Sequence, residues 1–555
     1  MRHIRNLRWK TWVIAAAVAG SGALTIAAGD NYFEISKNLE IFTELFKELN
    51  IYYVEDTKPG TLMKTGIDAM LNSLDPYTNY IAESDIEEYR FQTTGQYGGI
   101  GALIKKKGDG VVISEPYEGY PAAKAGIWAG DMILEIDGQK VKGLGTDEVS
   151  KLLKGQAGST VKVVLERQGR QPQEKSLVRE EIKIPDVPYK GMVDEAHHVG
   201  YLKLNSFTQT ASYEVRNALK ELKEKGAEKV ILDLRGNGGG LLREAVNIVN
   251  LFVPKGQLVV ETKGRIDEWD KSYRTLSEPF DAEIPLVVLV DGGSASASEI
   301  VSGSLQDLDR AVIIGERTYG KGLVQQTRDL FYNAKLKVTV AKYYIPSGRC
   351  IQKLDYGHRD STGHAIEVSD SLINEFHTKN GRAVFDGRGI LPDVKVDEPE
   401  LPKVVGALYG EDVFFDFATN YRMTHDSIGA PEQFVITDAL YQEFTEFARK
   451  HKFDYGTNSM AAFDDLVASA KKERYYEHAQ AAFEQLKKEL EPDADEEMQL
   501  FRADIAEVLR NEIVSRYDLQ TGRARAALTQ DAYVKEALDV LNNGTYIGIL
   551  DGTVH

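Results

Sequence analysis

The chain has 555 residues, 42% of them hydrophobic and 27% charged, and its 85 acidic against 67 basic residues give a formal net charge of -18. This length favours three or four domains rather than one core. The acidic balance, without a long basic segment, argues against nucleic acid as a partner. The single cysteine, Cys350, excludes an internal disulfide and a cysteine-rich metal site.

Residues 1–30 are predicted to direct export. The first ten residues carry four basic side chains, and an uncharged apolar run follows over residues 11–28. This order is typical of a secretory signal peptide or an uncleaved membrane anchor. The run is at the lower edge of membrane-spanning length, so both alternatives stay open. In either case we expect the remaining chain to be periplasmic or held at the outer face of the cytoplasmic membrane.

Residues 31–94 are predicted to be helical. Apolar side chains recur at helical spacing over residues 35–49 and again over residues 63–74. The region carries no recognisable chemistry. We therefore expect it to serve packing or oligomerisation.

Residues 95–170 are predicted to form a small β-rich module. The stretch 120–141 combines a short helix, a glycine turn and a strand that ends in Asp137-Gly138, a hairpin signal. A helix at residues 146–154 and a strand at residues 159–169 follow. This order of elements resembles a PDZ domain. An unrelated small β module is the weaker alternative.

The PDZ resemblance implies a peptide-binding site. In that family a glycine loop offers backbone N–H groups to the C-terminal carboxylate of a peptide, which then adds as a strand. The matching loop here is Gly99-Ile100-Gly101-Ala102. Because Ile100, Ala102 and Val149 are small or aliphatic, we expect the site to accept an apolar last side chain.

Residues 171–400 are predicted to form an α/β core. Strand-like and helical segments alternate, at residues 200–207, 212–227, 229–236, 240–253, 284–290, 297–308 and 311–315, before a long strand at 334–345. Alternation of this kind predicts a layered sheet with helices packed on it. Ligand sites in such sheets gather at the carboxyl ends of the strands, where "DLRGNGGG" (233–240) and "VDGGSAS" (290–296) lie.

A serine in the second motif lacks the usual base. A serine hydroxyl is a weak nucleophile without one, yet the sequence has no histidine from Tyr201 through Gly357. Lys321 lies between two glycines in "GERTYGKG" (315–322), which fits most of a nucleotide-binding P-loop. Gly322 replaces the required serine or threonine, and a β-hairpin pattern replaces the required helix, so we reject that interpretation. A Ser-Lys dyad would supply the missing base.

The sequence over roughly residues 35–400 resembles the carboxyl-terminal processing proteases, also called tail-specific proteases. The resemblance rests on separate motifs in the same order, including "LDPYT", "YGGIGA", "DLRGNGGGLL", "GSASASEI", "YGKGLVQ" and "GRGILPDV". It implies a catalytic core of the layered ClpP/crotonase type with an inserted PDZ domain and flanking helical regions. It further implies that Ser296 is the nucleophile, Lys321 the base and Gln325 the group that orients the lysine.

Physical chemistry is compatible with these implied roles. A free lysine has a pKa near 10.4, and keeping it neutral near pH 7 costs about 4 kcal/mol, which burial can supply. Alternation along a strand at 321–325 would place Lys321 and Gln325 on one face. The N–H of Ala297, at a helix start, and a glycine N–H, for which we favour Gly239, would form the oxyanion hole. The family has proline where this chain has Gly238, which leaves open which glycine donates. We interpret Glu299 as a partner of the helix dipole.

Residues 401–555 are predicted to be helical and charged, without a recognisable motif. We assign no metal site and no cofactor to the chain. The expected partners are proteins with free apolar C-termini, and a second copy of the chain or an adaptor protein. The alternative function is a proteolytically silent PDZ scaffold, which would lack a member of the dyad. Ser296, Lys321 and Gln325 are all present.

Overall fold

The computed structural model describes residues 32–397, 401–451, 453, 456, 458–490 and 493–554. The chain divides into two compact units, Met1–Tyr80 and Ile81–His555. The predicted signal or anchor at residues 1–30 lies outside the described residues. Within the described ranges, no helix combines the length and the apolar character needed to span a bilayer.

The first unit is helical, as predicted. Residues 32–52 form one helix, and α2 spans Pro59–Asn72. Many apolar side chains of the first helix are exposed, namely Phe33, Ile35, Leu39, Ile41, Phe42, Leu45 and Leu49. The helix therefore carries far more exposed apolar surface than scattered single residues would. Strand β1 (Asn79–Ile81) includes the residues on both sides of the boundary between the two units in the sequence.

The second unit begins with α3 (Ile86–Thr94) and the β module, which we define as residues 96–183. Its elements are β2 (Gln96–Gly99), β3 (Ala102–Lys107), β4 (Gly110–Pro116), α4 (Pro121–Lys124), β5 (Met132–Ile136), β6 (Gln139–Lys140), α5 (Thr146–Leu153), β7 (Thr160–Glu166), β8 (Gln173–Val178) and β9 (Glu180–Lys183). The main sheet has the order β3-β4-β5-β7-β8, so β3 is an edge strand. Asp137 and Gly138 both have positive φ and form the predicted hairpin turn between β5 and β6.

A six-stranded sheet forms the centre of the second unit. Its order is β10 (Tyr189–Asp194), β11 (Val199–Lys203), β12 (Lys229–Asp233), β15 (Leu286–Val290), β16 (Val312–Gly315) and β23 (Val394–Lys395). From β11 onward the pairings are parallel, and β10 is antiparallel to β11. All five residues of β15 are buried because helices cover both faces. The predicted α/β core is confirmed.

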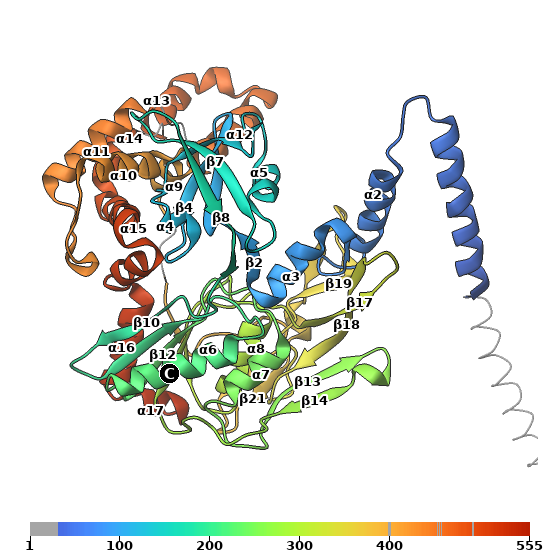
Figure 1. Cartoon of the computed structure of the whole chain (residues 1–555). Helices are drawn as coiled ribbons and strands as arrows, with labels where there is room; N and C mark the ends of the chain where they lie inside the picture. Colours follow the sequence, from blue (N-terminus) through green and yellow to red (C-terminus); the bar gives the residue numbers. More distant parts are fainter. Residues whose placement is uncertain are drawn as a thin grey trace, which may run out of the picture. The chain divides into compact units, whose positions relative to one another are not determined.

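The two faces of this sheet are covered by segments that lie far apart in the sequence (Figure 1). Helices α6 (Ala211–Glu224), α7 (Leu242–Val249) and α8 (Ala297–Asp307) pack on one face. Helices α16 (Ala532–Asn542) and α17 (Thr545–Leu550) pack on the other, against alternate residues of the same strands. The end of the chain is thus part of the core, although the predicted boundary at residue 400 separates the two in sequence.

A second, antiparallel sheet includes the strand that follows the segment with Lys321, residues 316–322, which we call the lysine loop. It pairs β17 (Leu323–Asp329) with β18 (Lys335–Tyr344), β18 with β13 (Leu258–Gly264), and β13 with β14 (Lys271–Arg274). The β17–β18 hairpin confirms that the stretch after Lys321 does not open a helix. Two small hairpins follow, β19 (Leu354–Arg359) with β20 (Ala365–Glu367) and β21 (Glu375–His377) with β22 (Ala383–Phe385).

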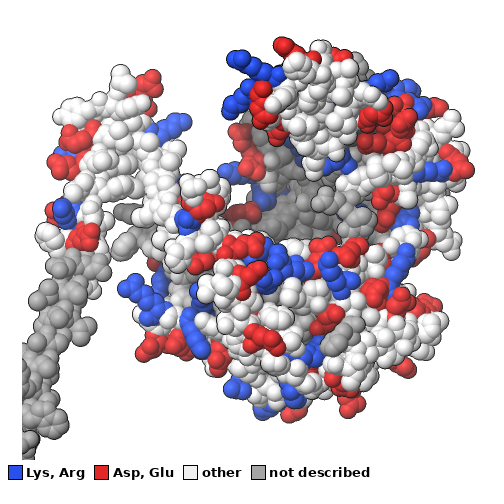
Figure 2. All heavy atoms as spheres, turned by 180° about the vertical axis from the view of Figure 1, so that it is seen from behind, with Lys and Arg blue, Asp and Glu red and all other residues white. Residues whose placement is uncertain are grey.

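The region after residue 400 is helical, as predicted. It contains α9 (Lys403–Gly410), α10 (Val413–Thr424), α11 (Asp438–Lys450), α12 (Asn458–Lys472), α13 (Gln480–Leu490), α14 (Ala494–Leu500) and α15 (Arg502–Leu528). Helix α15 is kinked at Asp518 and Leu519. Lys105 of β3 lies over the ring of Phe415 in α10, 3.3 Å from its centroid, so this region contacts the β module directly. Acidic and basic side chains are interspersed on the face shown in Figure 2.

Candidate active site

Ser296 lies on a strained turn between the end of β15 and the start of α8. Its φ of 55° and ψ of -110° are rare for a residue with a side chain. Such a conformation costs about 1–3 kcal/mol and is concentrated at functional sites. Ser296 is half-buried, whereas Ala295 and Ala297 on either side of it are buried. The turn therefore presents this one side chain to the surface.

The carboxylate of Glu299 joins the serine turn to the lysine loop. Its Oε2 accepts the N–H of Ser296 at 2.8 Å and the N–H of Lys321 at 2.9 Å. Because both bonds end on one oxygen, the two backbone nitrogens lie within two hydrogen-bond lengths of each other. The structure thus brings together Ser296 and Lys321, which the sequence places in different segments. Lys321 is half-buried.

The second oxygen of Glu299 completes this bridge. Its Oε1 accepts the hydroxyl of Thr318 at 2.6 Å and the N–H of Gly320 at 2.7 Å. The side chain is fully buried. Burial raises the pKa of Glu299, while the four hydrogen bonds it accepts favour the ionised form. Glu299 therefore does more than the predicted interaction with the helix dipole.

The glycines beside Lys321 are required by the neighbouring backbone. Gly320 has a φ of +89°, and a Cβ there would lie 2.5 Å from Cβ of Lys353. A Cβ at Gly322 would lie 2.8 Å from the backbone nitrogen of Gln352, and the N–H of Gly322 donates to Oε1 of the same residue at 2.8 Å. Glycine on both sides of Lys321 thus allows residues 352–353 to approach this backbone closely.

Gln325 lies in β17, and Lys321 precedes this strand. The side-chain amide of Gln325 donates to the hydroxyl of Thr339, its partner in β18, at 3.2 Å. The structure therefore places Gln325 four residues beyond the lysine, with Thr339 as its hydrogen-bond acceptor. Its role in orienting Lys321 stays a prediction.

Gly239 packs directly against the serine turn. Its φ is +98°, and a Cβ at this position would lie 2.9 Å from the nitrogen of Ala297 and 2.9 Å from Cβ of Ser296. No side chain fits there. The N–H of Gly239 donates to Oδ1 of Asn237 at 2.9 Å, so this N–H is engaged within the loop. Ala297 is the first residue of α8, at the positive end of the helix dipole.

Asn237 is a site residue that the sequence analysis missed. It is fully buried, and its backbone carbonyl accepts the N–H of Ala295 at 3.0 Å and the hydroxyl of Ser298 at 2.8 Å. Its side chain donates to the carbonyl of Leu204 at 2.8 Å. Asn237 therefore holds the residues on both sides of Ser296. The single asparagine among the glycines of residues 236–240 could have indicated this role. In the same way, the Ser-x-x-Glu spacing of a capping box could have indicated the role of Glu299.

The predicted peptide site lies at the start of the edge strand β3. The carbonyls of Ile100 and Gly101 accept N–H groups of Ala122 and Tyr117, at 2.9 Å each. In a trans peptide the following N–H points the opposite way, so the N–H groups of Gly101 and Ala102 point away from that segment. Gly99 ends β2, paired with Glu180. A cavity of about 800 Å³ adjoins the loop and the end of α5, and its lining includes Phe91, Tyr97, Gly98, Lys151 and Lys154.

The three apolar residues predicted for this site lie at different depths. Ile100 and Val149 are 3% and 0% exposed and belong to the core of the β module. Ala102 is half-buried beside them. In this structure Ile100 and Val149 therefore do not line the open cavity, because they pack against strands of the module.

The site offers a hydroxyl, an amine and backbone donors. Among the described residues, no three His, Cys, Asp or Glu side chains are grouped to hold a metal ion. A hydroxyl and an amine on neighbouring turns could together support nucleophilic attack on a carbonyl carbon, the hydroxyl as nucleophile and the amine as its base.

Three segments match known protein families. Residues 198–357 match peptidase family S41, residues 112–167 match the PDZ domain, and residues 404–541 match the probable PDZ-protease C-terminal helical domain. The chain is 37% identical, over 321 residues, to a carboxy-terminal-processing protease of Bartonella bacilliformis, covering 57% of this chain and 73% of that protein.

Two further proteins are similar over longer stretches. A probable CtpA-like serine protease of Staphylococcus aureus is 33% identical over 366 residues, which cover 65% of this chain and 66% of that protein. The solved structure of the photosystem II D1 C-terminal processing protease is 30% identical, covers 65% of this chain and 93% of its own, and has a TM-score of 0.36.

Proposed function

Because this chain belongs to the carboxy-terminal-processing proteases and is a serine-type peptidase with the S41 and PDZ domains, we propose that it is an exported endopeptidase that cleaves proteins near their C-termini with a Ser296–Lys321 dyad. The observation that carries the proposal is the bridge of Glu299, whose Oε2 accepts both the N–H of Ser296 and the N–H of Lys321. We propose export because residues 1–28 combine basic and apolar segments in the order of a signal peptide or anchor. The destination is the periplasm or the outer face of the cytoplasmic membrane.

The proposed reaction is acyl transfer. Neutral Lys321 takes the proton of the Ser296 hydroxyl as Oγ of Ser296 attacks the peptide carbonyl. Lys321 then passes that proton to the leaving amine. Gln325 orients the lysine. The oxyanion is stabilised by the N–H of Ala297 and by the N–H of Gly239 once it turns from Asn237. Water then hydrolyses the ester on Ser296.

We propose that the PDZ domain recruits the substrate by its free C-terminus. The edge strand β3 can accept a peptide as a further strand, and the N–H groups of Gly101 and Ala102 face away from the module's own acceptors. Because Ile100 and Val149 lie in the module's core, an apolar last side chain would insert only after local opening between β3 and α5.

Amidation of the substrate C-terminus tests this recruitment. We expect an unstructured substrate with a free C-terminus to be cleaved about tenfold faster, below saturation, than the same substrate amidated, since hydrogen bonds to a charged group contribute about 1.5–3 kcal/mol. A short peptide that reaches only the active site should be cleaved equally in both forms and serves as the control. Equal rates for the free and amidated long substrates would contradict recruitment by the PDZ domain.

We also propose that the N-terminal helix mediates self-association. Its exposed apolar residues, among them Leu39 and Leu45, are an unpartnered surface that a second copy could cover. Light scattering of the wild type at micromolar concentration should give a dimer or larger species. Replacing Leu39 and Leu45 with glutamate should reduce it to a monomer, whereas Lys37→Glu should leave the assembly unchanged. A monomeric wild type would contradict the proposal.

A further inference from the structure

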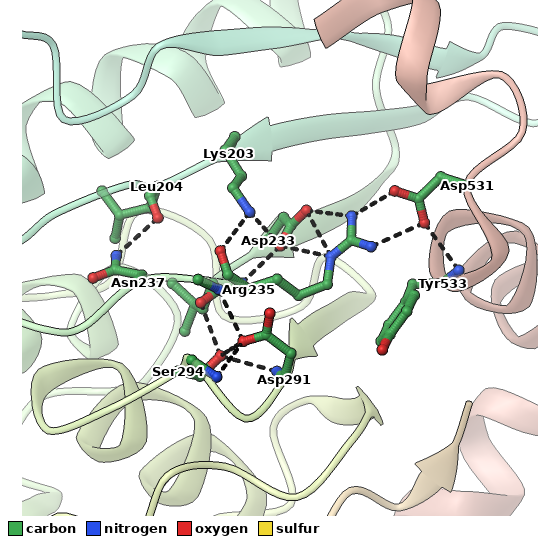
Figure 3. A network of polar contacts seen from close by, with 12 residues as sticks. Lys203, Leu204, Asp233, Arg235, Asn237, Asp291, Ser294, Asp531 and Tyr533 are labelled. Atoms are coloured by element: carbon green, nitrogen blue, oxygen red, sulfur yellow. Dashed lines mark hydrogen bonds and ion pairs between the residues drawn. The ribbon is translucent and has the colours of Figure 1, made fainter. Parts of the chain in front are cut away.

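Asp531, at the start of α16, forms an ion pair with Arg235, which directly precedes the loop of residues 236–240 (Figure 3). Arg235 donates from Nη1 to Oδ1 of Asp531 at 3.0 Å and from Nη2 to Oδ2 at 2.6 Å. This two-pronged geometry is the strongest form of an arginine–carboxylate contact. The side chains of Arg235 and Asp531 are 17% and 15% exposed, so solvent screens the pair only in part.

Arg235 is held from its other side by Asp233, at the end of β12. Nη2 of Arg235 donates to Oδ2 of Asp233 at 2.6 Å, and Lys203 lies 3.1 Å from Oδ1. Asp233 is fully buried, which by itself would raise its pKa, but the charges of Lys203 and Arg235 hold the pKa at about 2. Two carboxylates and two cations thus balance within one cluster, and Asp531 supplies one of the four charges.

The backbone that follows Arg235 forms the oxyanion side of the site. The N–H of Gly236 donates to Oδ1 of Asp291 at 2.8 Å. Asn237 holds Ala295 and Ser298, the neighbours of the nucleophile, and Gly239 packs on Ala297. The Arg235 backbone, whose carbonyl accepts from Lys203 at 2.6 Å and whose N–H donates to Asp233 at 2.8 Å, leads directly into residues 236–240, which meet the serine turn.

Resting on the proposed function, we propose that Asp531 is a positioning residue that fixes Arg235 and, through it, the loop of residues 236–240 against Ser296. Helix α16 then contributes to the reaction and does not only cover the sheet. Asp531 lies outside the S41 match at 198–357 and within the match to the C-terminal helical domain at 404–541.

An asparagine substitution separates this role from simple structural support. Oδ1 of Asp531 also caps α16, accepting the N–H groups of Tyr533 and Val534 at 2.9 and 3.1 Å. Asparagine caps a helix as well as aspartate does but lacks the charge for Arg235. Asp493 is a matched control, because its Oδ1 caps α14 by accepting two backbone N–H groups in the same way. Asp531→Glu retains the carboxylate.

The test compares wild type with Asp531→Asn, Asp531→Glu and Asp493→Asn by hydrogen exchange over residues 234–241 and by kcat and KM. In Asp531→Asn we expect severalfold faster exchange in this loop and a loss of about tenfold or more in kcat at nearly constant KM, because small misplacements of reacting groups are costly. Asp493→Asn should stay near wild type, and Asp531→Glu should recover part of the loss because it restores the charge. Asp531→Asn should also melt at a lower temperature, because it loses the ion pair with Arg235, so kcat and KM are measured well below the melting temperature of every variant.

Two results would overturn the proposal. One is a rate of hydrogen exchange over residues 234–241 of Asp531→Asn that equals the wild-type rate. The other is faster hydrogen exchange in these residues with an unchanged kcat. If the wild type itself shows no turnover, the proposed protease function fails. Loop exchange then still decides whether Asp531 positions residues 236–240.

Discussion

Replacing either Ser296 or Lys321 with alanine should reduce kcat for an unstructured protein by about six orders of magnitude, as loss of the nucleophile or of its base does in other serine peptidases. Ser296→Ala removes the oxygen that attacks the substrate, and Lys321→Ala leaves that oxygen protonated. The double variant should be no slower than either single one, because the two residues act as one unit. Single-turnover assays with purified protein would measure this.

Matched variants separate chemistry from folding in this experiment. Ser302→Ala removes another hydroxyl of α8, which donates only to the carbonyl of Ser298 within the helix, and should retain activity. Lys342→Ala removes an exposed lysine of the neighbouring strand β18 and should also retain it. Gln325→Ala should lose less activity than Lys321→Ala, since Gln325 carries no proton in the reaction. Substantial turnover by Ser296→Ala would rule out the proposed nucleophile.

Replacing Glu299 with glutamine should lower kcat by about a hundredfold and also lower the melting temperature. The carboxylate accepts four hydrogen bonds, among them the N–H groups of both Ser296 and Lys321. In glutamine one oxygen becomes an NH₂ group, which faces donors instead of accepting from them. Each buried donor left without an acceptor costs about 1–3 kcal/mol. The serine turn and the lysine loop should then separate.

Glu244→Gln is the control for loss of stability alone. Glu244 is another buried glutamate that accepts a backbone N–H, from Ser212 at 2.8 Å, but it lies at the start of α7. Its variant should melt at a lower temperature and keep its kcat. If Glu299→Gln loses no more activity than Glu244→Gln at a similar loss of stability, the bridge does not position the dyad.

The local patterns of the sequence were sufficient for most elements of the core and for the position of Ser296. Strand β15 is continuously apolar and is followed by small residues, so a buried strand and a turn into a helix could be predicted from a few neighbouring residues. The turn at Asp137-Gly138 was predictable for the same reason. Such features depend on short-range chemistry.

Features that depend on distant partners could not be predicted. The apolar face of α16 indicates that this helix is buried but not that it packs on β12, β15 and β16. The four donors to Glu299 come from two separate segments. Ile100 and Val149 have side chains that suit either a pocket or a core, and only the packing of the β module distinguishes the two. The N–H of Gly239 was assigned to the oxyanion hole, but the side chain of Asn237 decides where it points.

The central claim, that Lys321 is the base for Ser296, is tested most directly by the pH dependence of Lys321→Arg. Arginine keeps a positive charge and a long side chain, but its guanidinium does not deprotonate in proteins. Hydrolysis by wild type should rise with pH as Lys321 loses its proton, whereas Lys321→Arg should stay inactive up to about pH 9.5, where free lysine begins to deprotonate. Retained turnover by Lys321→Arg at alkaline pH would mean that another group is the base, and would contradict the dyad.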